Sequence, residues 1–291
     1  MEDAASPLML RRRLRTELRM ARQNKELTQE QVAKTMEWSL SKMNRIEKAK
    51  SGISTNDLKA LLSLYGIADK EQTDELLALA RAARQNPWWS RYRDVAPGEL
   101  LELIEYESAA SAVSQFETIF VPGILQTEEY ASAVLQVFYG DKSSAEHVAA
   151  LVDLRTKRRD LLTRENAPQF TFVLDESVIH RLVGSPSVTS QQLEHLVDIA
   201  KLPNVTVQVV PFRAGLHPGM KGPFEVVEFY DTPDEDIVFV EEQGGDYIRD
   251  DPKETNSYLE AFGHITQKSL APSHSVDRVR KAAGEMTGKS S

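Results

Sequence analysis

The sequence of 291 residues contains no cysteine, few aromatic residues (7%) and no long apolar run. Without cysteine, the chain has no disulfide bonds, thiolate metal sites or cysteine nucleophiles. A membrane-spanning helix needs ~18 consecutive apolar residues, and no segment approaches this length. Residues 1–13 include arginines but lack the apolar segment of a secretory signal. We therefore expect a cytoplasmic protein without a membrane partner.

Motifs of the common enzyme classes are also missing. The histidines, at positions 147, 180, 195, 217, 264 and 274, include no pair at the spacing of zinc ligands on a helix. Neither a G-x-S-x-G nucleophile turn nor a phosphate-binding loop ending in Gly-Lys-Ser/Thr occurs. Asp175 and Glu176 are adjacent carboxylates that could act as a pair, but capping a helix is the simpler role. The glycine-rich segment 213–222 could form a lid or an anion nest, but a connector between strands is the simpler interpretation. We predict that the protein is not an enzyme and has no cofactor and no metal.

The net charge of −9 conceals an uneven distribution. Residues 1–60 hold 13 Lys and Arg against 8 Asp and Glu, a net charge of +5, and the remaining residues hold 22 against 36, a net charge of −14. A basic part joined to an acidic remainder is expected where only the first part contacts phosphate. Chance clustering explains the charges equally well, so the spacing of residues has to decide.

The N-terminal part has the pattern of several short helices. Apolar residues recur at helical spacing from Leu10 to Ala21, and arginines fill the opposite face. Residues Thr28–Gln31 form a capping box at the start of a second helix. Ser39 is a suitable N-cap for a third helix, and a fourth ends at Gly66. Short helices with a tight turn between the second and the third predict a helix-turn-helix.

The segments LTQEQVA (27–33) and SLSKMNRIE (39–47) resemble the Xre/Cro-type phage-repressor family. Caps, inward apolar positions and polar positions agree in register over residues 11–66. The resemblance implies that the helix after Ser39 is the recognition helix, which lies in the major groove of DNA. The positions that it implies for contact with base edges are Ser39, Leu40, Ser41, Lys42, Asn44 and Arg45.

The chemistry of these positions suits base recognition. Lys42 and Arg45 can donate to guanine, Asn44 can pair with adenine, and Leu40 can contact a thymine methyl group. The alternative is a domain that keeps this fold and serves only in protein contacts, with the basic residues as ordinary surface charges. We favour DNA binding because basic faces of this kind normally supply affinity for phosphate.

The resemblance also assigns residues to other roles. Gln29 matches a position that binds the phosphate backbone at the N-terminus of the second helix. Lys48 and Lys50 are further candidates for phosphate contact. Arg22 and Glu47 match a pair that forms a structural salt bridge in this family.

Two positions depart from the family pattern. The glycines that are usual before and after the recognition helix are Glu37 and Ala49 in this sequence. A non-glycine residue in left-handed geometry costs roughly 1–2 kcal/mol. We therefore expect a slightly remodelled turn, which leaves the fold in place and the docking angle of the recognition helix open.

The length suits two domains, and the patterns predict a mainly α-helical chain with an α+β second domain. The expected parts are a helix-turn-helix bundle at 8–66, a helical and aromatic linker at 67–97, and at 98–286 a sensing or partner-binding domain with helices around a small β-sheet. A long helix is predicted from Glu99 to Phe116. Strands are predicted at 170–174, 205–210, 224–229 and 237–240.

Two clusters in this second part admit more than one role. The aromatic residues within 88–92 could stack on bases, but packing into the second domain at a hinge is favoured because aromatic residues bury much apolar area. The basic residues within 155–159 could bind phosphate, but a solvated helix face is favoured.

The second part also looks like the C-terminal domain of a large actinomycete family of Xre-type regulators, over roughly residues 88–275. The residues that carry this resemblance are Trp89, Tyr92, Asp94, VPGILQT (121–127), Asp175, Glu176, Gly184, Gln192, Leu193, Val209–Pro211 and Gly222–Phe224. The resemblance implies a transcription regulator that pairs with a small acidic protein encoded nearby, in an antitoxin-like or developmental arrangement.

Together, these patterns predict a sequence-specific regulator that binds an inverted repeat of double-stranded DNA as a homodimer. The second domain would receive the signal that controls binding. A small protein partner is the first interpretation of that signal. A small-molecule ligand in an apolar pocket is the alternative, and a catalytic second domain is the least favoured.

Overall fold

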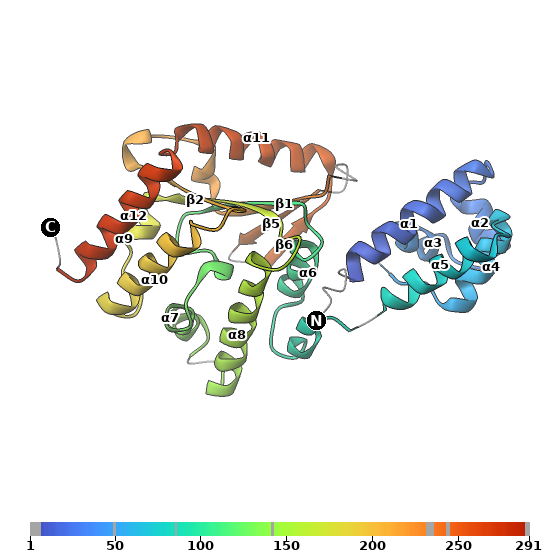
Figure 1. The fold of residues 1–291 in the computed structure, drawn as a ribbon, viewed down its shortest axis with the longest axis horizontal. Helices are drawn as coiled ribbons and strands as arrows, with labels where there is room; N and C mark the ends of the chain where they lie inside the picture. The colour runs from blue at the N-terminus through green and yellow to red at the C-terminus, as the bar shows by residue number, and fades with distance from the viewer. Residues whose placement is uncertain are drawn as a thin grey trace. The chain divides into compact units, whose positions relative to one another are not determined.

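The computed structural model describes residues 7–48, 51–84, 86–140, 143–230, 236–242 and 245–288 (Figure 1). The chain divides into two compact units, Met1–Ser90 and Arg91–Ser291. The first unit is helical, and the second combines helices with a β-sheet. The predicted class, mainly α-helical with an α+β second part, is confirmed.

The first unit, over its described residues, is a bundle of short helices. These are α1 (Pro7–Asn24), α2 (Gln29–Thr35), α3 (Leu40–Glu47), α4 (Thr55–Tyr65) and α5 (Lys70–Ala82). Every helix contributes to one core, whose buried members include Leu14, Leu18, Val32, Ala33, Met43, Ile46, Leu58, Leu61, Leu76 and Leu77. Helix α5 contacts α1 and α4 through this core, so it is a member of the bundle.

The ends of these helices follow from their capping residues. The backbone N–H of Gln31 donates to Thr28 Oγ1 (3.2 Å) and the backbone N–H of Thr28 donates to Gln31 Oε1 (2.8 Å), which completes the capping box. Ser39 and Ser54 cap α3 and α4 in the same way with one bond each. Gly66 ends α4 with φ +73°, a conformation that favours glycine. The caps predicted from the sequence are confirmed.

The second unit contains a mixed sheet and its covering helices. Its helices are α6 (Gly98–Glu107), α7 (Glu128–Tyr139), α8 (Ala145–Arg158), α9 (Glu176–His180), α10 (Pro186–Ile199), α11 (Pro252–Lys268) and α12 (Pro272–Met286). Its strands are β1 (Ala112–Glu117), β2 (Gln169–Asp175), β3 (Val205–Val210), β4 (Phe224–Glu228), β5 (Ile237–Glu242) and β6 (Gly245–Arg249). The strand order is β3-β2-β1-β4-β5-β6.

Strands β1, β2 and β3 are parallel, and β4, β5 and β6 continue the sheet in antiparallel pairs. Helices α7 and α8 connect β1 to β2, and α9 and α10 connect β2 to β3. Figure 1 shows α11 over one face of the sheet and α6, α7, α8 and α10 on the other. Phe116, Phe224 and Phe262 belong to the core between the sheet and α11.

The expected helix from Glu99 to Phe116 is wrong in its second half. Helix α6 ends at Glu107, and residues 112–117 form β1, which lies inside the sheet between β2 and β4. Strand β1 is buried on both faces, with Phe116 on one face and Gln115 and Glu117 on the other, so it lacks the usual alternation of buried apolar and exposed polar residues. Strand β6, at the edge of the sheet, was also missed.

The basic run on α8 does not form the expected solvated helix face, and its arginines bind groups within the chain rather than standing free for phosphate. Nε and Nη2 of Arg158 donate to the two carboxylate oxygens of Glu107, at 2.6 and 2.7 Å. The side chains of this pair are 7% and 0% exposed. Arg155 and Arg159 donate to the side chain and the backbone of Gln126. The run therefore ties α8 to α6 and to the segment before α7.

The aromatic cluster at 88–92 forms a short 3-10 helix. Tyr92 is buried, and its hydroxyl donates to Asp153 Oδ2 of α8 at 2.6 Å. The favoured interpretation, packing into the second domain, is confirmed for Tyr92.

Candidate nucleic-acid interface

Helices α2 and α3 form the helix-turn-helix, and the turn between them contains Glu37. Glu37 has φ +55°, so it adopts the left-handed conformation that would suit glycine. The turn therefore keeps a left-handed residue here, and Glu37 bears the strain. Ala49, the other departure from the family pattern, lies outside the described residues.

Helix α3 has one buried face and one accessible face. Met43 and Ile46 are buried in the core of the first unit. The six positions expected to contact bases are exposed or half-buried: Ser39, Leu40, Ser41, Lys42, Asn44 and Arg45. Leu40 is 45% exposed, although it is a large apolar residue. The sequence therefore places six accessible side chains, polar except for Leu40, on a short helix and its N-cap residue.

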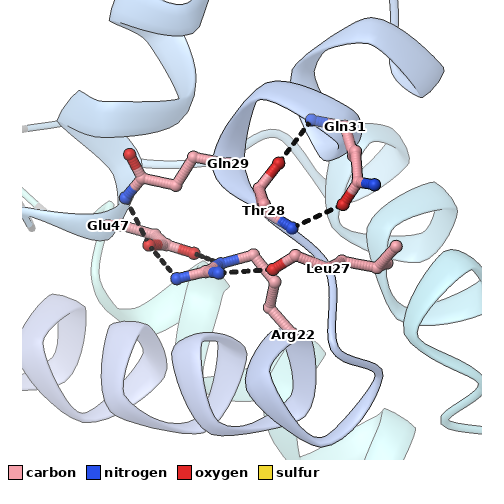
Figure 2. A network of polar contacts seen from close by, with 6 residues as sticks. All are labelled: Arg22, Leu27, Thr28, Gln29, Gln31 and Glu47. Atoms are coloured by element: carbon pink, nitrogen blue, oxygen red, sulfur yellow. Dashed lines mark hydrogen bonds and ion pairs between the residues drawn. The ribbon is translucent and has the colours of Figure 1, made fainter.

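An ion pair between Arg22 and Glu47 joins α1 to α3 (Figure 2). Arg22 donates to both carboxylate oxygens of Glu47, at 2.7 and 3.1 Å, and to the backbone oxygen of Leu27 at 2.6 Å. The Glu47 side chain is 3% exposed. Hydrogen bonding to Glu47 raises the pKa of Arg22. This pair fixes the end of α3 against the first helix.

Gln29, the first residue of α2, belongs to the same network. Its Nε2 donates to Glu47 Oε2 at 2.6 Å, as Figure 2 shows. Glu47 therefore receives hydrogen bonds from α1 and α2 and holds the two helices and α3 in one arrangement. The contact of Gln29 with phosphate stays a prediction. The bond to Glu47 was missed because no local sequence signal connects residues 18 positions apart.

Lys42 is also held by contacts within the first unit. Its Nζ lies 3.0 Å from Asp57 Oδ2 and 4.1 Å from the centre of the Trp38 ring. Asp57 lies in the first turn of α4, where a negative charge is favourable. The Lys42 ammonium group is thus shared between a carboxylate and an aromatic face. No role for Asp57 or Trp38 was predicted from the sequence.

The remaining phosphate candidates lie at the end of α3. Lys48 is the C-cap residue of α3 and is exposed. Lys50 lies outside the described residues. The roles of both lysines stay predictions.

In the second unit, the adjacent carboxylates have separate structural roles. Asp175 caps α9 by accepting the backbone N–H of Ser177 at 2.9 Å, which confirms the simpler interpretation for this residue. Glu176 is buried and pairs with Arg278 of α12. Within the described ranges, no cluster of His, Asp or Glu could hold a metal ion. No helix among the described residues has the length and apolar character to cross a membrane.

Comparison with known proteins assigns the two units separately. Residues 13–76 match the family model of a helix-turn-helix domain. Residues 100–281 match the family model of a domain of unknown function (DUF5753). Neither a curated protein nor a solved structure gave a match. The first match contains the whole of α2 and α3, and it supports a DNA-binding transcription regulator.

Proposed function

Because the chain belongs to the family defined by the domain of unknown function DUF5753 and carries a helix-turn-helix domain before it, we propose that it is a sequence-specific transcription regulator of the Xre type. In this proposal α3 is the recognition helix, and the protein acts on double-stranded DNA in the cytoplasm. The second unit controls DNA binding.

One observation carries this proposal: α3 is fixed by the Arg22–Glu47–Gln29 network while its outward side chains stay accessible. Side chains that contact base edges need a helix whose position is set before binding. The Ser39 cap leaves the N-terminal turn of α3, the part that enters the major groove, at the surface. The net charge of +5 on residues 1–60 supports attraction to phosphate.

A single helix-turn-helix covers a short stretch of DNA, so specificity calls for two copies. We infer a homodimer on an inverted repeat, because the symmetry of an operator mirrors the symmetry of the protein. The resemblance to actinomycete regulators supports control by a small acidic protein that binds the second unit, in an antitoxin-like arrangement. The strongly acidic character of this unit is consistent with a part of the chain that does not itself contact DNA.

The test is selection of genomic fragments by the purified full chain at two salt concentrations. The variant Lys42→Ala/Arg45→Ala changes the exposed face of α3. The control Lys70→Ala/Arg81→Ala removes the same number of charges from exposed positions of α5. We expect the intact protein and the control to enrich one palindromic site, with weaker binding at high salt. The α3 variant should enrich no site.

The homodimer is tested on the enriched site itself. Shortening that site to one half should reduce affinity sharply, because one recognition helix then loses its contacts. Equal affinity for the half site would contradict the dimer. If neither the intact protein alone nor the protein with cell extract enriches any site, the helix-turn-helix has a role other than DNA recognition.

A further inference from the structure

The segment between β3 and β4, residues 211–222, exposes three large apolar side chains. We call it the 211–222 loop; it contains two 3-10 helices, Phe212–Ala214 and Pro218–Lys221. Phe212, Leu216 and Met220 are 62%, 84% and 58% exposed. The loop lies against α11 and is the light orange segment beside that helix in Figure 1.

The middle of the loop is anchored to the sheet. The His217 side chain is 1% exposed, and its ring lies perpendicular to the ring of Phe116 of β1, with ring centres 5.7 Å apart. Burial lowers the pKa of His217, which favours the neutral ring. Gly219 packs so closely on Phe116 that a Cβ atom would lie 2.3 Å from the ring. The part of the loop between Leu216 and Met220 is therefore packed firmly against β1.

Two charged residues fix the backbone at other points. The N–H of Phe212 donates to Glu176 Oε2 at 2.6 Å. Lys268, at the end of α11, donates to the backbone oxygen of Leu216 at 2.7 Å. Burial would raise the pKa of Glu176, but the Phe212 N–H and Arg278 outweigh it and lower that pKa. A loop tied at these places displays Phe212 and Leu216 without the ordering cost that a free segment has on binding.

The exposed apolar residues need an explanation, because Phe212 stacks on the His180 ring with ring centres 6.4 Å apart and still leaves most of its side chain exposed, and Leu216 and Met220 are exposed to a similar degree or more. Exposed apolar groups that lie close together commonly mark an interaction site. Phenylalanine supplies a large contact area, and methionine adapts to irregular surfaces. Single scattered apolar residues are ordinary, but three on one anchored loop are not.

The charges on the loop define its partner. The 211–222 loop contains Arg213 and Lys221, both exposed, and no acidic residue. It belongs to a part of the chain, residues 61–291, with a net charge of −14. An extended polyanion such as DNA or an anionic membrane would reach well beyond the loop and be repelled by the net negative charge of this part of the chain. Because salt screens charges more than about 10 Å away, a short acidic segment would respond mainly to Arg213 and Lys221.

We propose that the 211–222 loop is a docking surface for an acidic protein segment that places apolar side chains over Phe212, Leu216 and Met220. Arg213 and Lys221 pair with carboxylates at the rim of that contact, where charges mainly steer association and fix orientation. The apolar residues supply the affinity at its centre. The regulatory consequence of docking rests on the proposed function, whereas docking itself is measured without DNA.

The experiment uses the full chain and a random peptide library displayed on phage. The loop variant is Phe212→Ser/Leu216→Ser/Met220→Ser. The control is Ile119→Ser/Val137→Ser/Phe138→Ser, which removes three apolar side chains that are exposed elsewhere on the second unit (44%, 81% and 53%). Peptides selected on the intact protein are then synthesised, and their Kd is measured by fluorescence anisotropy. Unchanged thermal unfolding shows that each variant is folded.

We expect the selected peptides to combine Asp or Glu with large apolar residues. Their Kd should rise at least about tenfold for the loop variant and for Arg213→Glu/Lys221→Glu, and should not change for the control. Selected peptides without an acidic bias, no selected peptides, or equal binding by the loop variant would overturn the proposal.

Two further measurements test whether the 211–222 loop binds a membrane or a second copy of the chain instead of an acidic protein segment. Sedimentation with phosphatidylglycerol vesicles that is lost in the loop variant would show a membrane surface instead. Concentration-dependent dimerisation that is lost in the loop variant would show a second copy of the chain instead. Either result overturns the proposal. If the intact protein binds no peptide but still selects DNA fragments, the docking surface is wrong and the proposed function stands. If it binds peptides but selects no DNA fragment, the proposed function is wrong and the docking surface stands.

Discussion

Lys42 of α3 and Asp57 of α4 are joined by a 3.0 Å ion pair at the face that we propose contacts DNA. The two side chains are 42% and 32% exposed, so water partly screens the pair. Its contribution to stability is correspondingly small, on the order of 0.2–1 kcal/mol. The more important effect is positional: the pair and the Trp38 ring limit where the Lys42 ammonium group can lie.

Replacing Asp57 by asparagine should therefore affect specificity more than folding. The change Asp57→Asn removes a negative charge near the proposed DNA-contacting face and breaks the ion pair that holds Lys42. Affinity for unrelated DNA should rise, because Lys42 can then pair with any phosphate, while preference for the selected site falls. The measurement is the ratio of Kd values for the selected site and a shuffled sequence of equal length.

The matched control for this prediction is Asp74→Asn, which removes the same charge from an exposed position on α5. It should leave the Kd ratio near that of the intact protein. If Asp57→Asn behaves like the control, Lys42 is not positioned by Asp57, and its role in base contact has to be reconsidered.

Glu37 provides a test of strain in the turn before α3. Because Glu37 has φ +55°, Glu37→Gly should stabilise the first unit by about 1 kcal/mol. Hydrogen exchange of the slowest amides in α2 and α3 should slow correspondingly, provided that they exchange through unfolding of this unit. The control Lys34→Gly introduces glycine inside α2 and should destabilise by a similar amount. Faster exchange in Glu37→Gly would show that the glutamate side chain contributes more than the strain costs.

Local signals predicted the first unit well, and non-local contacts explain what was missed. Thr28, Ser39 and Gly66 act on backbone groups a few residues away, so their caps can be recognised from the sequence alone. The Lys42–Asp57 pair joins two helices and has no local signature. The predicted contacts of α3 with bases depend on a partner molecule, so side-chain exposure is compatible with them and does not test them.

In the second unit, the missed strand and the misinterpreted basic run have one cause. Glu117 of β1 and Arg158 of α8 are buried charged or polar groups where apolar residues are usual. Each looks like a surface position until its partners are known. The partner of Arg158, Glu107, is 51 positions away in the sequence. Removing one member of such a buried pair typically costs about 3–5 kcal/mol, so these contacts define the fold although no local pattern shows them.

Glu225 of β4 makes this buried cluster sensitive to pH. Its carboxylate lies 3.7 Å from Arg158 Nη2 and is 2% exposed. Neither carboxylate oxygen accepts an N–H or O–H group from the described residues, whereas a protonated Glu225 can hydrogen-bond to the Glu107 carboxylate. Arg158 already pairs with Glu107, which lies close enough to repel a second negative charge. Burial, followed by the Glu107 carboxylate, raises the pKa of Glu225 well above its ordinary value.

The raised pKa predicts that the second unit loses stability as pH increases. Between the ordinary and the raised pKa, folded Glu225 keeps a proton that the unfolded chain releases. The free energy of unfolding should therefore fall by about 1.4 kcal/mol per pH unit over this window for this one group, and be fully retained below it. Glu225→Gln keeps the neutral form at every pH, so the variant should have a flatter profile and exceed the intact protein at the alkaline end. Urea unfolding followed by circular dichroism across pH measures both profiles.

Glu117 and Glu241, whose pKa values burial also raises, remain in the variant, so only part of the slope should disappear. The exposed change Glu260→Gln should leave the slope unchanged. A Glu225→Gln profile parallel to that of the intact protein would mean that Glu225 is ionised in the folded state, with Arg158 shared between two carboxylates.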